Sequence, residues 1–189
     1  KDSIRLNEAY AKYIMTKRPF VILKVAMTLD GKIATPEGES KWITGEKARE
    51  LVHKTRGSVD AVMTAIGTVK ADDPQLTARC QGIKVSRVQE IKNPKRIVID
   101  PNLEIQLNAR VLQTPPETII VTKGFGVRGQ GSGVGEKKKM LLDRGVRIIE
   151  YDTERLDLGW LLERLGKMEI TSVLIEGGSS LNSHALEYG

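Results

Sequence analysis

The chain has 189 residues, of which 40% are hydrophobic and 29% are charged, and its net charge is +6. This length fits a single domain, alone or with a short arm, and the apolar content is sufficient for a buried core. No apolar run approaches the roughly 18–20 residues of a membrane-spanning helix, and the first residues lack the apolar segment of a signal peptide. We therefore expect no membrane partner.

Cysteine and histidine are scarce in this chain. Cys80 is the only cysteine, and His53 and His184 stand far apart. An internal disulfide is therefore impossible, which is typical of the cytoplasm, and no zinc-ligand spacing exists. With so few nucleophiles and bases, we expect no metal, and we expect a cofactor to supply the reactive group.

The positive charge leaves three interpretations open: a basic solvated surface, a site for small phosphorylated ligands, or nucleic-acid binding. Lysines and arginines are scattered along the chain, and the one cluster, at 137–139, has no aromatic residues nearby that could stack on bases. We therefore expect no nucleic-acid partner.

The expected elements begin with a short amphipathic arm at 1–13. Apolar runs rich in β-branched residues predict buried strands at 19–27, 59–67, 96–100, 118–122, 146–151 and 172–178. Helical spacing predicts helices at 44–57, at 158–167 and from 180 onward, with Thr44 as the first N-cap and Gly57 as its stop. Strands that alternate with helices predict an α/β fold with a largely parallel sheet, whose ligands bind beyond the carboxyl ends of the strands.

Glycines gather at 124–139, in the stretch GFGVRGQGSGVGEKKK. Residues 124–129 match the G-x-G-x-x-G pattern of dinucleotide-binding proteins, and Glu150 follows at the spacing of the ribose-binding acid. Three further glycines, however, prevent a helix from starting where that motif needs one. We therefore favour the competing interpretation, a mobile surface loop.

The stretch IEGGSSLNSHAL, at 175–186, offers a better phosphate site. A strand that ends at Glu176 is followed by two glycines and by two serines that open a helix. The free N–H groups and the dipole of a helix start favour an anion. The same residues could also form only a tight turn between strand and helix, so both interpretations stay open.

The segment GTVKADDPQLTAR, at 67–79, follows another expected strand. Asp72 and Asp73 before a proline are typical of a turn, and two adjacent carboxylates make a weak metal site. With Thr68 before them and Arg79 after them, one carboxylate could contact a polar ligand and the arginine a phosphate.

Six segments together resemble the reductase domain of the bifunctional deaminase/reductases of riboflavin biosynthesis, which has a dihydrofolate-reductase-like fold. In chain order they are LKVAMTLDGKIAT, SKWITG, HKTRGSVDAV, GTVKADDPQLTAR, RIVID and LIEGG. The resemblance runs from about residue 19 to 186. It implies a three-layer α/β/α domain with a mostly parallel mixed sheet at 19–189, preceded by a linker or arm at 1–18.

The resemblance also implies an activity, the NADPH-dependent reduction of 5-amino-6-(5-phosphoribosylamino)uracil at C1′ of its opened ribose, which gives the ribityl product. A hydride that comes from a cofactor would account for the shortage of catalytic His and Cys. A reductase of another pyrimidine or a pterin, and a non-catalytic nucleotide-binding module, are the alternatives. Because no acidic residue closely follows the TIIVT strand, Thr122, Lys123 and Arg128 are candidates for the 2′-phosphate of NADPH, although the two cations could be simply solvated.

By the resemblance, three groups of residues form the site. The catalytic candidates, which polarise the reacting imine or bind the base, are Lys24, Asp73 and Glu176. The substrate contacts, with both arginines on the phosphate, are Ser40, Arg56, Leu76 through its backbone, Arg79 and Glu176. The cofactor contacts are Ala26, Trp42, Thr68, Asp72 and, in the pyrophosphate loop, Gly178, Ser179, Ser180, Leu181, Asn182, Ser183 and His184.

Structural alternatives stay open for several of these residues. Trp42 could be a core aromatic, Arg56 a cation at a helix C-terminus, Lys24 a strand residue that reaches to solvent, Asp73 a turn residue, and Glu176 a partner of a helix N-terminus.

The sequence departs from the family pattern in three respects. It shows no counterpart of the zinc deaminase domain that precedes the reductase in bifunctional members. The further strands that complete the sheet and a homodimer interface in the family do not follow Gly189. We therefore expect a homodimer and a larger natural protein, of which this chain is the downstream part. Pro101, at a position that contacts the cofactor in relatives, has no N–H to donate.

Overall fold

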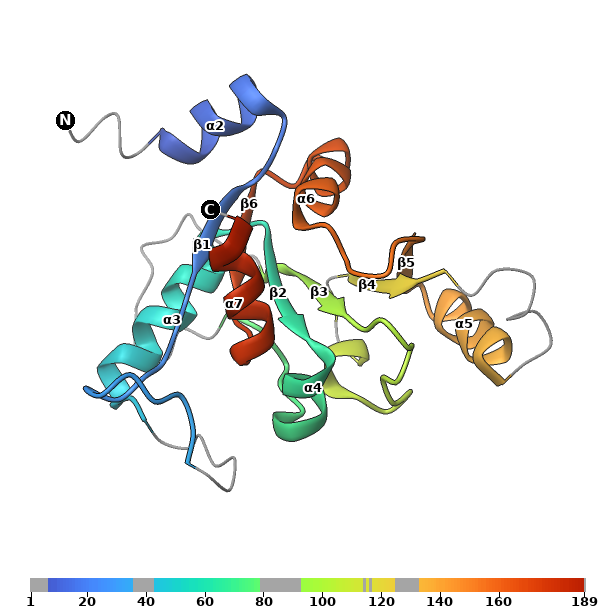
Figure 1. Ribbon diagram of the computed structural model, residues 1–189, viewed down its shortest axis with the longest axis horizontal. Helices are drawn as coiled ribbons and strands as arrows, with labels where there is room; N and C mark the ends of the chain where they lie inside the picture. Colours follow the sequence, from blue (N-terminus) through green and yellow to red (C-terminus); the bar gives the residue numbers. More distant parts are fainter. Residues whose placement is uncertain are drawn as a thin grey trace, which may run out of the picture.

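The computed structural model describes residues 7–35, 43–78, 93–113, 115, 117–124 and 133–188. Within these ranges six strands form one sheet in the order β1-β6-β2-β3-β4-β5, which Figure 1 shows. The strands are β1 Phe20–Leu23, β2 Ala61–Ala65, β3 Lys95–Ile99, β4 Thr118–Lys123, β5 Arg147–Tyr151 and β6 Ser172–Ile175.

Each strand lies inside an apolar run that predicted it or extends at most one residue beyond that run, so the α/β class is confirmed. All five pairings between the described strands are parallel, and the antiparallel pairing of a mixed sheet is not found among them. The central strands β2, β3, β4 and β6 are largely buried on both faces, which accounts for apolar runs that are continuous and not alternating. The edge strands β1 and β5 are partly exposed.

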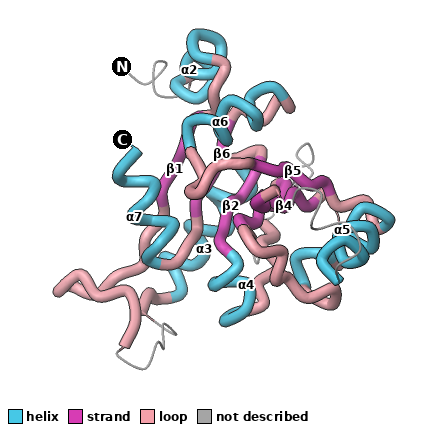
Figure 2. Tube along the Cα trace, turned by 45° about the vertical axis from the view of Figure 1, so that its right-hand side comes forward, coloured by secondary structure: helices cyan, strands magenta, loops and turns pink. Residues whose placement is uncertain are grey.

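Helices cover both faces of the sheet, as Figure 2 shows in a second orientation. They are α2 Glu8–Thr16, α3 Glu46–Ser58, α4 Ile66–Asp72, α5 Gly133–Asp143, α6 Leu158–Lys167 and α7 Ser179–Tyr188, with a 3₁₀ turn η1 at Arg110–Leu112. One core cluster joins alternate strand residues to α6 and α7 through Leu161, Leu165 and Leu181. The other joins the opposite strand face to Val69 of α4 and Leu141 of α5. The three expected layers are therefore present.

The ends of α3 differ from the prediction. The helix begins at Glu46 with Gly45 as its N-cap, while the carbonyl oxygen of the predicted cap, Thr44, accepts a hydrogen bond from Arg49 Nη1 at 2.9 Å. Gly57, the predicted stop, lies inside the helix. The chain leaves the helix in an extended conformation at Val59, so the left-handed conformation that favours glycine is not used there.

Residues 66–72 form α4, whereas the sequence predicted a strand as far as residue 67 and a turn at Asp72 and Asp73. The helix is short and holds one fully packed side chain, Val69, so its apolar period is too brief to detect. It ends at Asp73, which adopts a left-handed conformation with φ of 39° and donates its N–H to the carbonyl of Val69.

The expected mobile loop at 124–139 is wrong in its second half, because α5 begins at Gly133. Strong helix formers from Glu136 onward outweigh the glycines, and Leu141 is fully buried against the sheet. Residues 125–129 of the glycine motif lie outside the described residues. Glu150, the acid that the motif would need, accepts a hydrogen bond from Lys138 Nζ at 2.5 Å.

The second half of the expected arm forms α2, whose end packs on α6 and α7. Tyr13 Oη donates to the carbonyl of Gly166 at 3.1 Å, and Arg18 pairs with Glu163 of α6. A Cβ atom on Gly166 would lie 1.9 Å from the carbonyl oxygen of Lys17, so the two backbones touch. In the described part of the chain, we find no helix with both the length and the apolar character needed to cross a membrane.

Candidate functional site

A cleft of about 880 Å³ opens beyond the carboxyl ends of β1, β2, β3 and β6. Because these strands are parallel, the segments that follow them emerge at one edge of the sheet. This is the edge where the α/β fold class predicts a ligand site. The walls of the cleft come from α3, α4 and the first turn of α7, which Figure 1 shows around these strand ends.

An ion pair between α3 and the end of β6 lines this cleft. Arg56 Nε lies 2.6 Å from Glu176 Oε1, and Arg56 Nη2 lies 2.9 Å from Glu176 Oε2, so the pair is bidentate. The exposed fractions of the two side chains are 15% and 9%. Arg56 Nη1 donates a third hydrogen bond, to the carbonyl of Thr77 at 3.2 Å. The pair joins residues 120 positions apart, and such planar pairing is characteristic of arginine with carboxylate.

The backbone of Glu176 is held by β2. Its N–H donates to the carbonyl of Met63 at 2.8 Å, and its own carbonyl accepts a hydrogen bond from Thr64 Oγ1 at 2.7 Å. Thr64 is fully buried. The position of the carboxylate therefore depends on side-chain rotation alone.

The cleft-facing side of α3 carries two polar residues that the sequence analysis did not propose. Arg49, His53 and Arg56 all line the cleft, at the i, i+4, i+7 spacing that places residues on one helix face. His53 Nδ1 lies 3.2 Å from the carbonyl of Thr77. The signal was present in the sequence, because the helix had been predicted and its polar residues at this spacing could have been read together.

The start of α7 forms the opposite wall and contains most of the predicted pyrophosphate loop. Gly178, Ser179, Ser180, Leu181 and Asn182 line the cleft. A Cβ atom on Gly178 would lie 3.7 Å from Thr68 Oγ1, so the glycine keeps open a narrow space between α4 and α7. This space next to free N–H groups suits a close backbone contact with an anion.

Asn182 adds an unusual polar group to that wall. The residue is 8% exposed, and its Oδ1 atom is buried without a hydrogen-bond partner in the described part of the chain. Buried polar atoms are normally paired, so the position favours a ligand or a water that donates to this oxygen.

Lys24 lies at the end of β1, on the floor of the same cleft. Its backbone N–H donates to the carbonyl of Ile175 at 3.0 Å, which fixes it beside the strand that carries Glu176. Its ammonium group forms no ion pair with a described residue. Ala26, Thr68, Asp72 and Leu76, which the resemblance also implied, line the cleft as well. Leu76 has a left-handed φ of 53°.

Three of the predicted site residues do not line the cleft. Asp73 Oδ1 accepts a hydrogen bond from the N–H of Arg110 at 2.8 Å, which gives its carboxylate a structural partner. Ser183 and His184 follow the lining residues of α7 but do not line the cleft themselves. Burial lowers the pKa of His184, and the nearby charge of Arg155 lowers it further. Ser40, Trp42 and Arg79 lie outside the described residues.

Two of the three residues considered for a 2′-phosphate have partners away from the cleft. Thr122 is fully buried and donates its hydroxyl to the carbonyl of Pro101 at 3.1 Å. Lys123 pairs with Glu154 at 3.0 Å. Neither residue lines the cleft, although Pro101 does, and Arg128 lies outside the described residues.

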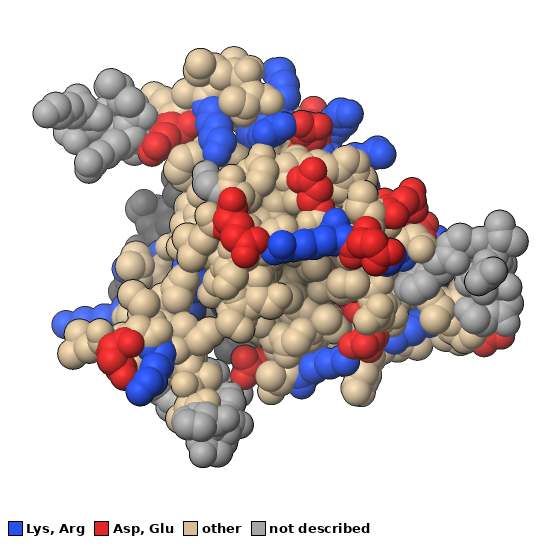
Figure 3. All heavy atoms as spheres, viewed as in Figure 1, with Lys and Arg blue, Asp and Glu red and all other residues tan. Residues whose placement is uncertain are grey.

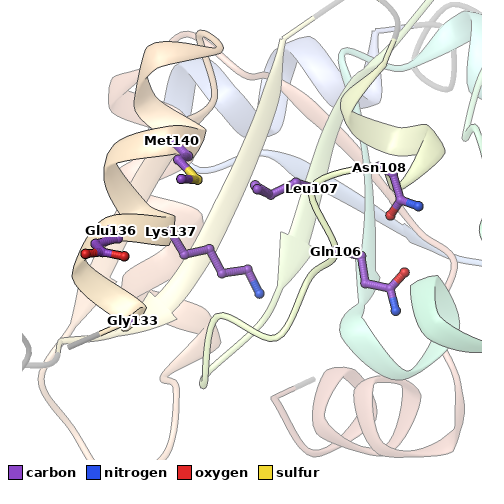
Figure 4. A pocket seen from close by; sticks show the side chains of 7 residues that line it. All are labelled: Gln106, Leu107, Asn108, Gly133, Glu136, Lys137 and Met140. Atoms are coloured by element: carbon purple, nitrogen blue, oxygen red, sulfur yellow. The ribbon is translucent and has the colours of Figure 1, made fainter.

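A second hollow, of about 510 Å³, lies between α5 and the loop at 106–108. Figure 4 shows Lys137 reaching from α5 toward the loop that carries Gln106 and Leu107. Of the described residues that line it, one is acidic and one is basic, Glu136 and Lys137, and both come from the same helix. The cleft at the carboxyl ends of the strands is therefore the stronger candidate site.

Charges of both signs are interspersed on the face of the molecule drawn in Figure 3. Lysines and arginines lie beside acidic residues, and several form ion pairs, for example Arg155 with Glu187 at 2.6 Å. Charges of one sign therefore form no large patch among the described residues on this face.

The fold and the cleft define an α/β protein whose candidate site lies at the carboxyl edge of a parallel sheet. A family model described as the RibD C-terminal domain matches residues 19–189. The chain is also 41% identical over 174 residues to an archaeal protein from Methanothermobacter thermautotrophicus, covering 91% of this chain and 73% of that protein. The relative is named 2,5-diamino-6-ribosylamino-4(3H)-pyrimidinone 5′-phosphate reductase. The chain therefore belongs to the RibD C-terminal domain family, and the resemblance inferred from its motifs is confirmed.

Longer relatives agree with this assignment. The chain is 44% identical over 186 residues to riboflavin biosynthesis protein RibD of Actinobacillus pleuropneumoniae, covering 97% of this chain and 46% of the relative. A solved structure of Acinetobacter baumannii RibD aligns with a TM-score of 0.81 and 35% identity, covering 97% of this chain and 47% of that chain. The chain thus spans about half the length of the RibD relatives that it matches.

Proposed function

We propose that this chain is a reductase of riboflavin biosynthesis that uses NADPH to reduce 5-amino-6-(5-phosphoribosylamino)uracil to its ribityl product. The observation that carries the proposal is the pairing of two unlike walls in one cleft, a cationic face of α3 and the glycine-opened start of α7. The first wall suits the ribose phosphate of the substrate, and the second suits the pyrophosphate of a dinucleotide. The names of the relatives support the same reaction class.

The residues present fit a nicotinamide dinucleotide. The space that Gly178 leaves open beside Thr68 admits a phosphate close to the backbone, and a side chain at that position would narrow it. Ser179 and Ser180 at the start of α7 would hold the pyrophosphate, while Thr68 and Asp72 would contact the cofactor from α4. A bound reduced nicotinamide supplies a hydride.

Lys24 and Glu176 lie between the two walls and would position the reacting end of the substrate. In the opened substrate a C=N bond at C1′ accepts the hydride at carbon and a proton at nitrogen. The ammonium of Lys24 is suited to polarise that nitrogen and to hold the proton for it. Glu176, fixed through its backbone, would accept hydrogen bonds from the substrate.

The experiment is to mix the purified chain with NADPH and the phosphoribosylaminouracil and to follow the loss of reduced-nicotinamide absorbance. Substrate-dependent oxidation is expected, and it should fall about 100-fold in Lys24→Ala. Lys167→Ala, which removes an exposed lysine at the end of α6, is the matched control and should behave as the unmodified protein. Binding of NADPH without turnover in the unmodified chain would argue for the non-catalytic nucleotide-binding module.

A second substrate is favoured by the archaeal relative, whose name specifies a diaminopyrimidinone with the same phosphoribosylamino group. The two substrates differ in the pyrimidine ring and share the ribose phosphate, so the cationic wall serves both. Parallel assays with the uracil and the diaminopyrimidinone would decide between them through the ratio of their kcat/KM values.

The setting of the reaction is also part of the proposal. RibD relatives are about twice as long as the region matched here, which supports an upstream deaminase domain in the natural protein. A homodimer in the cytoplasm stays a prediction from the resemblance, and sedimentation of the purified chain would test its oligomeric state.

A further inference from the structure

The guanidinium of Arg56 already has partners on all three nitrogen atoms. Nε and Nη2 donate to the two oxygens of Glu176, and Nη1 donates to the carbonyl of Thr77. Three of its five N–H groups are thus in use, including the two that form the planar fork. A phosphate that binds Arg56 in the same bidentate manner has to take the place of the carboxylate.

The electrostatics of the pair point in the same direction. Arg56 and Glu176 are both largely buried in the cleft wall, so their opposite charges cancel where a phosphate would approach. While Glu176 is bound to Arg56, an anion that enters the cleft approaches an ion pair with no net charge, and the carboxylate occupies the guanidinium. Once the carboxylate withdraws, the same anion meets an unpaired guanidinium.

The backbone around the pair does not have to move for that exchange. The backbone of Glu176 is held by Met63 and Thr64 of β2, and Thr77 can keep its hydrogen bond to Arg56 throughout. Only the side chain of Glu176 needs to rotate. It would then point toward the remainder of the cleft, which Lys24 also lines.

We propose that Glu176 competes with the ligand's phosphate for Arg56, so that phosphate binding releases the Glu176 carboxylate toward the substrate. This inference rests on the proposed function, because the phosphate is that of the ribosyl substrate. The ion pair thereby makes the cleft selective for phosphorylated ligands. A ligand without phosphate leaves the pair closed and the carboxylate occupied.

Titration calorimetry with ribose 5-phosphate and with ribose tests the competition without any cofactor. Glu176→Gln keeps the shape of the side chain but removes the charge that holds Arg56. We expect this variant to bind ribose 5-phosphate about tenfold more tightly than the unmodified chain, a difference of about 1.4 kcal/mol. Ribose should bind equally weakly to both proteins.

Glu187→Gln is the matched control for charge. Glu187 lies in the last turn of α7, where it pairs with Arg155, and it does not line the cleft. It removes the same unit of negative charge, so it accounts for any general gain in anion affinity. Its affinity for ribose 5-phosphate should stay within about twofold of the unmodified chain, because exposed charges are screened by salt.

Three results would overturn the proposal: equal affinity in Glu176→Gln and the unmodified chain, weaker affinity in the variant, or no measurable binding by either protein. If Glu176→Gln does not fold, Glu176→Asp replaces it, since the shorter carboxylate cannot close the bidentate pair, and the same outcomes apply. If the unmodified chain has no reductase activity but Glu176→Gln binds ribose 5-phosphate more tightly, the reductase function is rejected and the competition is retained. An active chain with unchanged affinity would reject the competition alone.

Discussion

Asp100 and Glu176 follow strands β3 and β6, which lie on either side of β2, and their carboxylates have different kinds of partner. Asp100 comes directly after β3, is fully buried, and accepts hydrogen bonds from the N–H groups of Glu104 and Ile105, both at 2.8 Å. Glu176 comes directly after β6 and is bound by a side chain from α3, in the wall of the cleft. A carboxylate at the end of a parallel strand is therefore no sign of function by itself. The two carboxylates differ in their hydrogen-bond donors. The backbone N–H groups that bind Asp100 close a turn, whereas the arginine side chain that binds Glu176 can bind a ligand in its place.

The largest expected effect is the loss of stability when Asp100, the carboxylate with backbone partners, is replaced. Asp100→Ala leaves the N–H group of Glu104 and the buried N–H group of Ile105 without their acceptor, so we expect the free energy of unfolding to fall by about 3 kcal/mol. Urea denaturation would measure it, with the exposed Asp143→Ala of α5 as the control. A loss as small as that of the control would show that the turn does not depend on Asp100.

Replacing Glu176 should have the opposite effect, a large loss of activity with a small loss of stability. Glu176→Gln should lower kcat by about 100-fold with NADPH and the phosphoribosylaminouracil, because the substrate loses a charged acceptor. Its free energy of unfolding should change by only about 1 kcal/mol, since Arg56 lines the open cleft and the single amide oxygen can still accept one hydrogen bond from it. Stability loss without loss of kcat would make Glu176 a structural residue like Asp100.

A third prediction concerns the wall opposite that pair. Gly178→Ala places a methyl group in the space beside Thr68 and should weaken NADPH binding about tenfold, because the phosphate can no longer approach the backbone. Fluorescence titration of NADPH measures this change. Gly133→Ala on α5, where a Cβ atom meets nothing within 4 Å, is the control. Equal affinities of the two variants for NADPH would show that the cofactor does not bind against the start of α7.

The smallest effect is expected at His184, beyond the cleft on α7. Burial lowers its pKa in the folded state below the ordinary value of 6.5, so the unfolded chain takes up the proton first as the pH falls. Its contribution to stability is present above pH 6.5 and is lost as the pH drops through the range below it. His184→Asn should make urea midpoints less sensitive to acid between pH 7.5 and pH 5.5. An unchanged pH dependence would contradict this.

Strand positions could be predicted from the sequence because strands buried on both faces leave continuous apolar runs, as RIVID does. The start of α7 after Gly177 and Gly178 was also evident, since glycines and serines mark a helix entry. The short helix α4 was missed because one buried side chain, Val69, makes no period. The pairing of Arg56 with Glu176 could not be predicted from spacing, because the parallel sheet, and no local pattern, brings α3 to the end of β6.

Gly166 shows how easily packing is mistaken for function. It lies on α6, and the carbonyl of Lys17 occupies the space of any side chain that could be added there. In a saturation-mutagenesis survey of this chain, every substitution at this position should lower the yield of folded protein, as strictly as substitutions in the cleft lower activity. A ranking of positions by their tolerance of substitution would group Gly166 with the cleft residues. Only a separate measurement of the amount of folded protein would distinguish a tightly packed position from a functional one.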